Sequence, residues 1–376
     1  MTRSTSRSGR WIVLAIVGLG AGMGLAGLLL REARGPSLPL KPGAIVVVTC
    51  EPAAKPAGLK YERPADPNRT TFSAAFAPSS EFVANLGSLW TGKMPRESGL
   101  VRNGDALRAD LPTLAEIVTG QGFVAAAFVA RDADELKKSG LARGFASVDA
   151  RPAASDAELA AKAAEWLVGR GTAPSLAWLH LRGEMAVDGF VARLHELHVD
   201  EHAVIVTAGP FASSAGGRVG LTLRLPVTLL PLRVDPQPVS LVDVVASLVE
   251  AFGVRAPDGI GTPYLMHPDV REPHFVLTTR PLSGAFADAD ELWLHTTKVE
   301  YVNAPVSGSP EPDTPLAKEL RAVVEERFRY QFEEVDLAEL LKSEAARLPP
   351  VVPVHSAASK PARIPIARST WSRASK

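Results

Sequence analysis

Residues 70–82 read TTFSAAFAPSSEF and open the stretch of sequence that decides the fold. Apolar and small residues up to Phe76 predict a short strand, and Pro78 with the two serines behind it predicts a break in the chain. A helix is expected next, ending in GSLWTG at residues 87–92, with small glycine and serine residues on one face. This part of the chain therefore predicts a strand, a tight connection and a helix in direct succession.

A second helix and a second strand complete the stretch. The segment LPTLAEIVTG has apolar residues at helical spacing, with Asp110 as the expected cap, Pro112 in the first turn and Gly120 at the end. The run FVAAAFVA at residues 123–130 is typical of a buried strand.

Further apolar runs indicate the fold class. Three apolar runs are continuous, as in strands buried on both faces of a parallel sheet: AIVVVT at 44–49, LAWLHL at 176–181 and AVIVT at 203–207. Helical segments separate these runs. The expected class is α/β, with a central, largely parallel sheet between helices. A small C-terminal antiparallel subdomain is expected from short strands at 275–279, 291–296 and 299–302.

The motifs SLWTG, LPTLAE and, at residues 140–145, GLARGF occur in an order that resembles the sulfatase branch of the alkaline phosphatase superfamily. The resemblance covers residues 44–302. It implies the fold just described and, in active members, hydrolysis of sulfuric or phosphoric esters by a nucleophile and a bound metal.

The family nucleophile is missing from this sequence. In the family, five residues precede the SLxTG motif: Cys or Ser, any residue, Pro, Ser and Arg. Counted back from Thr91, these five positions are residues 82–86 of this chain. Phe82 stands at the nucleophile position and has no group that can be activated for attack. Leu86 replaces the arginine that holds the anionic group in the family.

The family's metal ligands are also substituted. Where the resemblance implies acidic ligands after the first strand, this chain has Glu51 followed by Pro52, and where it implies an Asp-His pair after AVIVT, it has Gly209 and Pro210. Glycine and proline have no side-chain donor, and a lone carboxylate is a poor site for a hard cation. Glu51 is therefore read as a solvated residue at a strand end, and we expect no catalytic residue, metal or cofactor. Glu51, Phe82, Leu86, Gly209 and Pro210 would line a vestigial cleft.

Four neighbouring side chains are candidates to replace the family's catalytic groups. Ser79 and Ser80 follow Pro78 and are interpreted as turn or helix-cap residues, and Cys50 as a buried small hydrophobe. His180 matches the family's strand histidine, and without its partners it is expected to be a satisfied core imidazole.

Three histidines share a helical spacing and could in principle bind zinc: His195, His198 and His202. The strand at 203–207 follows too closely for His202 to stay on that helix face. Three surface histidines are the preferred interpretation.

The N-terminal residues predict a single membrane span. A charge-free apolar run at 11–30 follows three arginines, and at about 1.5 Å per residue it matches the hydrocarbon core of a bilayer. The alternative is a cleaved signal peptide. The resemblance favours a domain outside the cytoplasm, on the periplasmic side.

The expected organisation is a cytoplasmic stub and anchor at 1–34, a linker at 35–43, the sulfatase-like domain at 44–270, small sheet and helices at 271–348 and a disordered basic tail at 349–376. A flexible loop is expected at 213–220 and a strand at 225–229. A helix is expected from Pro238 to Gly253, and one or two helices in 315–347.

The formal net charge is zero, and no basic stripe indicates nucleic acid as a partner. The interpretation is a membrane-anchored, sulfatase-like pseudoenzyme that acts as a binding, structural or regulatory module of the cell envelope, with an envelope protein or a glycan as ligand. The alternative is a divergent ester hydrolase or phosphoethanolamine-type transferase with a relocated site. Regulation of an intact paralogue through the same face is a third possibility.

Overall fold

The computed structural model describes residues 40, 43–51, 68–211, 217–226, 233–254, 261–266, 276–295, 302–304, 315–336 and 363–370. The predicted span at 11–30 and nearly all of the linker lie outside these residues. Within the described part of the chain, no helix combines the length and the hydropathy needed to cross a bilayer.

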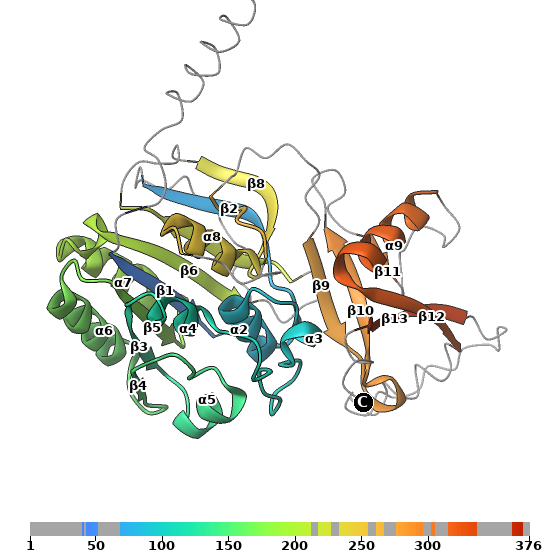
Figure 1. Cartoon of the computed structure of the whole chain (residues 1–376), viewed down its shortest axis with the longest axis horizontal. Coiled ribbons are helices and arrows are strands. Elements are labelled where there is room, and N and C mark those ends of the chain that lie inside the picture. The colour runs from blue at the N-terminus through green and yellow to red at the C-terminus, as the bar shows by residue number, and fades with distance from the viewer. Residues whose placement is uncertain are drawn as a thin grey trace, which may run out of the picture. The chain divides into compact units, whose positions relative to one another are not determined.

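The larger sheet has eight strands in the order β4-β3-β5-β1-β6-β7-β2-β8 (Figure 1). Its strands are β1 (Ala44–Cys50), β2 (Arg69–Phe76), β3 (Val124–Val129), β4 (Ser147–Ala150), β5 (Ser175–Leu181), β6 (Ala203–Phe211), β7 (Val219–Arg224) and β8 (Arg233–Ser240). Strands β4, β3, β5, β1 and β6 are parallel, β7 is antiparallel to both neighbours, and β2 and β8 are parallel to each other. The predicted mixed, largely parallel sheet is confirmed.

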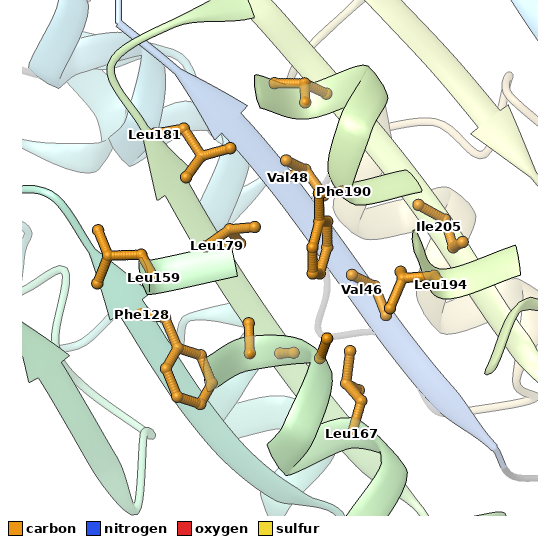
Figure 2. Packing of buried hydrophobic residues seen from close by; sticks show 14 of the residues in the cluster. Val46, Val48, Phe128, Leu159, Leu167, Leu179, Leu181, Phe190, Leu194 and Ile205 are labelled. Atoms are coloured by element: carbon orange, nitrogen blue, oxygen red, sulfur yellow. The ribbon is translucent and has the colours of Figure 1, made fainter. Parts of the chain in front are cut away.

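The helices are α2 (Phe82–Thr91), α3 (Pro95–Ser98), α4 (Leu114–Thr119), α5 (Ala133–Ser139), α6 (Asp156–Arg170), α7 (Glu184–Glu196) and α8 (Asp243–Ala251). Helices α6 and α7 cover one face of the sheet, where Leu167 and Phe190 pack on Val46 and Val48 of β1 (Figure 2). On the opposite face, Trp90 of α2 meets Trp178 of β5 with ring centroids 5.2 Å apart. The central strands are thus buried on both faces, as their continuous apolar runs require.

A glycine in the GLARGF motif explains part of the family pattern. Gly144 has a φ of +83°, and a Cβ there would lie 2.4 Å from the backbone nitrogen of Glu116 and 2.6 Å from the carbonyl carbon of Ala115. Only glycine combines that conformation with so close an approach to the first turn of α4.

The second sheet has five strands: β9 (Val276–Pro281), β10 (Ala289–His295), β11 (Val302–Ala304), β12 (Tyr330–Asp336) and β13 (Arg363–Ser369). All its pairings are antiparallel. Helix α9 (Pro315–Phe328) packs on it, with Val324 in a cluster with Leu277, Leu292 and Tyr330.

Several expectations about local structure are wrong. The cap of α4 is Thr113 in a capping box with Glu116, because Asp110 lies in a turn and residues 111–113 precede the helix. Residues 219 and 220 belong to β7 and not to a loop, and 225 and 226 lie beyond that strand. Helix α8 begins only at Asp243, because residues 238–240 end β8.

The end of the chain differs most from expectation. Of the range 315–347 predicted as helices, Pro315–Phe328 is helix α9, residues 330–336 form β12, and residues 337–347 lie outside the described residues. Arg363–Ser369, placed in the disordered tail, forms β13 between β10 and β12. An alternating RIPIARS segment with one proline gives little strand signal by itself, and pairing on both edges supplies the stability that local propensity lacks.

Candidate functional site

The fold brings the predicted site residues to one edge of the larger sheet. Glu51 follows β1, Arg131 follows β3, His180 lies near the end of β5, and Gly209 lies near the end of β6. The register places His180 beside Thr49 of β1, so these carboxyl ends meet. In α/β sheets, ligands bind outside the carboxyl ends of the strands, which makes this edge the candidate site.

Phe82, at the family's nucleophile position, is the first residue of α2 and is in contact with two of these side chains. The guanidinium carbon of Arg131 lies 5.2 Å from the centre of the Phe82 ring. The His180 ring is 5.5 Å from the same ring, tilted by 31°. A half-buried aromatic ring therefore takes the place of a reactive oxygen or sulfur.

Arg131 also joins two carboxylates. Its Nη1 lies 3.4 Å from Oε1 of Glu51, and its Nη2 lies 2.5 Å from Oε1 of Glu135 in α5. The Arg131 side chain is only 16% exposed, whereas the Glu51 side chain is 36% exposed. Glu51 is thus an ion-paired residue at the mouth of the site rather than the solvated strand end expected from the sequence.

A buried polar chain supports the site from below. Trp178 Nε1 donates to Thr49 Oγ1 at 2.9 Å, and Thr49 Oγ1 lies 2.9 Å from His180 Nδ1. The threonine hydroxyl can accept the indole N–H and still donate its own hydrogen to Nδ1, and the Glu51 carboxylate beside Nε2 favours this arrangement over the reverse one. His180 then carries its proton on Nε2.

The Nε2 atom of His180 points toward Glu51. It is buried, has no hydrogen-bond partner, and lies 3.8 Å from Glu51 Oε1. That distance is longer than a hydrogen bond, so the contact is electrostatic. The expectation of a satisfied core imidazole holds for Nδ1 and is wrong for Nε2.

The pKa shifts agree with an ionised Glu51 beside a neutral His180. Burial lowers the pKa of the His180 imidazole, with Glu51 acting in the opposite direction. The contact with His180 lowers the pKa of Glu51 against the effect of burial, and Arg131 lowers it further. Burial disfavours the charged imidazolium, while the fixed positive charge of Arg131 favours the carboxylate.

The other predicted residues lie as follows. Leu86, one turn along α2, is completely buried in the core, so it belongs to no cleft wall. Gly209 has a φ of +133°, and a Cβ there would lie 2.6 Å from Cys50 Sγ, which explains the glycine by close packing. Pro210 follows Gly209 in β6, and its side chain is not among those that the structure describes.

The candidate replacement nucleophiles are held in structural contacts. Cys50 is buried, and burial raises the pKa of its thiol to about 12, which leaves no thiolate at neutral pH. Ser79 is fully buried, its Oγ accepts from Glu81 N at 3.0 Å, and Ser80 N donates to Thr279 O. These contacts bear out the interpretation of the two serines as turn residues.

Two of the three histidines within residues 195–202 pair with acids instead of converging, whereas His202 is partly buried and its Nε2 has no hydrogen-bond partner. His195 Nδ1 lies 2.7 Å from Asp200 Oδ2, and His198 Nδ1 lies 2.7 Å from Glu201 Oε1. Both histidine side chains are more than 70% exposed, at 78% and 76%, so they are surface residues as expected. Across the described ranges, no three His, Cys, Asp or Glu side chains converge as a metal site.

The donor set at the strand edge does not fit the family's metal. Glu51 is the one carboxylate at the positions where the family places its ligands, and its oxygen faces a guanidinium. His180 presents an N–H there instead of a lone pair. Gly209 and Pro210 supply no side-chain donor. A divalent ion needs several oxygen or nitrogen lone pairs and is repelled by a fixed cation.

A separate cavity lies between α2, α8 and the second sheet. Its volume is about 360 Å³, and none of the predicted site residues lines it. The walls combine the aromatic Tyr264 and Phe328 with the buried carboxylate of Asp243, which accepts from Ser240 N at 2.8 Å.

Comparisons with solved structures identify the fold. The structure is similar to the phosphonate monoester hydrolase SpPMH from Silicibacter pomeroyi, with a TM-score of 0.56 and 14% identity over 77% of this chain and 94% of that one. It is similar to the lipoteichoic acid synthase LtaP from Listeria monocytogenes, with a TM-score of 0.53 and 14% identity over 75% and 90% of the two chains. A putative sulfatase from Bacteroides thetaiotaomicron gives 0.53 and 12% over 82% and 94%.

No protein-family model and no curated protein matches the sequence. The structural likeness therefore shows the sulfatase-like fold of the alkaline phosphatase superfamily, as the motifs implied, and it shows the fold alone.

Proposed function

We propose that this chain is a catalytically silent protein with a sulfatase-like fold that serves as a binding, structural or regulatory module of the cell envelope. Its N-terminal apolar run anchors it in a membrane, and its folded domain lies on the extracytoplasmic, periplasmic side. Its partner is an envelope protein or a glycan.

The observation that carries this proposal is the set of contacts around Phe82. The aromatic ring occupies the position of the nucleophile, and the charged groups beside it are used in contacts with one another: Arg131 with Glu51, and Glu51 with His180. Ester cleavage in this fold needs a nucleophile and a bound metal ion to stabilise developing charge. The side chains described at this edge supply neither a nucleophile nor a set of metal ligands.

The alternative function is an ester hydrolase or phosphoethanolamine-type transferase with a relocated site. The structural likeness to a protein named lipoteichoic acid synthase fits this alternative loosely. It requires a second nucleophile near a cation site. The burial of Cys50 and the contact of the Ser79 hydroxyl argue against these two residues in that role.

Elemental analysis of the full-length chain, purified in detergent without chelator, tests the proposal. We expect less than one divalent ion per ten chains. One tightly held ion per chain would revive the hydrolase alternative. The same preparation tests the anchor, because the full-length chain should sediment with membranes, and intact chain in the soluble fraction would refute it.

A further inference from the structure

The cation at this site is part of the chain itself. We propose that the guanidinium of Arg131 replaces the divalent cation as the permanent positive charge of this edge, so that the native site rejects divalent ions. The inference rests on the proposed function, because it explains how the fold remains stable at the carboxyl ends of β1 and β3 without a metal.

The geometry of Arg131 is that of a bound counter-ion. Its two terminal nitrogens face different carboxylates, Glu51 at 3.4 Å and Glu135 at 2.5 Å. A divalent ion between two carboxylates makes the same bridge, since hard cations are commonly held by one or two carboxylates and water.

The position of Arg131 is fixed by packing as well as by charge. The guanidinium carbon lies 5.2 Å from the centre of the Phe82 ring, a cation–π contact that strengthens as water is excluded. With its side chain 16% exposed, Arg131 is largely shielded from solvent and its ions. A covalently attached cation has no dissociation equilibrium, unlike a metal.

His180 also disfavours the binding of a divalent ion at Glu51. The Glu51 carboxylate lies 3.8 Å from Nε2 and favours the tautomer with the proton on that nitrogen, and Thr49 can then donate to Nδ1. Two positive or partly positive groups, Arg131 and the His180 N–H, are thus directed at one carboxylate. An incoming divalent ion would have to displace the first and reverse the tautomer of the second.

Removing the charge of Arg131 should therefore uncover a weak cation site. In Arg131→Gln the carboxylates of Glu51 and Glu135 lose their shared partner, and Mn²⁺, which suits carboxylate and water ligands, is the probe. We expect the variant to bind one Mn²⁺ at least about tenfold more tightly than the native chain, with a matching rise of the unfolding temperature when Mn²⁺ is added.

The controls separate charge from packing. Arg131→Lys keeps a positive charge and should bind no Mn²⁺, and the double change Arg131→Gln with Glu51→Gln should lose the gain. Arg218→Gln is the matched control, because Arg218 also lies over a phenylalanine, 5.7 Å from the ring centre of Phe76, and its loss should give no ion site. If Arg131→Gln is not recovered folded, Arg131→Met, which keeps the apolar stem, carries the same prediction.

The experiment is a Mn²⁺ titration of the full-length chain in detergent, read by the EPR signal of free Mn²⁺. A gain in the neutral variants that depends on Glu51 supports the proposal. It is overturned if the native chain binds one Mn²⁺ as tightly as the variants, if both neutral variants gain nothing, or if the gain persists without Glu51. Ester turnover by the native chain would instead overturn the proposed function, so the two failures are distinguishable.

Discussion

Two arginine–carboxylate pairs, one on each sheet, show how differently the same groups can be used. Arg96 of α3 holds Asp290 of β10 through both carboxylate oxygens, at 2.8 and 2.9 Å, and Tyr330 donates to the same carboxylate at 2.9 Å. Arg131 meets Glu51 through one contact of 3.4 Å. The first pair is buried and hydrogen-bonded through both carboxylate oxygens, whereas the second is partly exposed and has a single long contact.

The difference indicates two roles. The Asp290 side chain is 1% exposed, and burial raises the pKa of Tyr330, so this phenol stays protonated as a donor. A buried ion pair of this kind fixes the second sheet against α3. The pair at the candidate site lies at the sheet edge where active members of the fold carry their chemistry, and it neutralises charge without a rigid hydrogen-bond network.

The largest effect is expected from breaking the buried pair. Asp290→Ala leaves Arg96 without its carboxylate and should lower the free energy of unfolding by about 3–5 kcal/mol. Chemical denaturation measures it. Asp288→Ala is the control, because the Asp288 side chain is 49% exposed, and it should change stability little. Equal losses in the two variants would contradict the contrast drawn here.

An intermediate effect is expected below the candidate site. Thr49→Val removes the hydroxyl that connects Trp178 to His180 and should cost about 1–3 kcal/mol, because a buried indole N–H and a buried imidazole nitrogen lose their partner. Thr71→Val in β2 is the matched control, since the buried Thr71 hydroxyl has no hydrogen-bond partner. That change should be neutral or stabilising, and a greater loss there than at Thr49 would contradict the stabilising role of the buried polar chain.

The smallest effect is expected at Glu51, and it depends on pH. Its pKa is lowered in the folded chain, so its stabilising contribution is present above the unfolded pKa, about 4.3, and is lost as pH falls through the folded pKa. Glu51→Gln should remove this contribution, less than about 1 kcal/mol because the side chain is partly exposed. Denaturation from pH 7 to pH 3 measures it, with the exposed Glu165 of α6 changed to Gln as the control. The prediction would be contradicted if the free energy of unfolding of Glu51→Gln fell with pH as in the native chain, while that of Glu165→Gln fell less.

The sequence predicted the larger sheet well and the second sheet only in part. Continuous apolar runs such as 44–49 and 203–207 carry their strand signal locally, and the structure confirms them. Strand β13 lies in a proline- and arginine-containing segment and pairs with β10, far away in the sequence, so its stability comes from tertiary contacts that no local pattern shows.

At the site, the motif register placed Phe82, Glu51 and Gly209 at one edge but missed Arg131 and Glu135. Arg131 is the first charged residue after the buried run at 123–130, and carboxyl ends of parallel strands meet at one edge, so that position carried a usable signal. Glu135 follows Arg131 by four residues, so the local spacing of the two charges also carried a usable signal. The tautomer of His180 depends on Thr49 and Trp178, which only the strand register brings together.

The most direct test of the central claim is an activity measurement on the full-length chain in detergent. Aryl sulfates and aryl phosphates are offered as substrates, with calcium, magnesium, manganese or zinc present in turn. We predict no turnover above the buffer rate with any of these ions, because Phe82 has no group that can attack the ester and Arg131 takes the place of the metal ion. Turnover that disappears with EDTA, and also in Glu51→Ala, would contradict it.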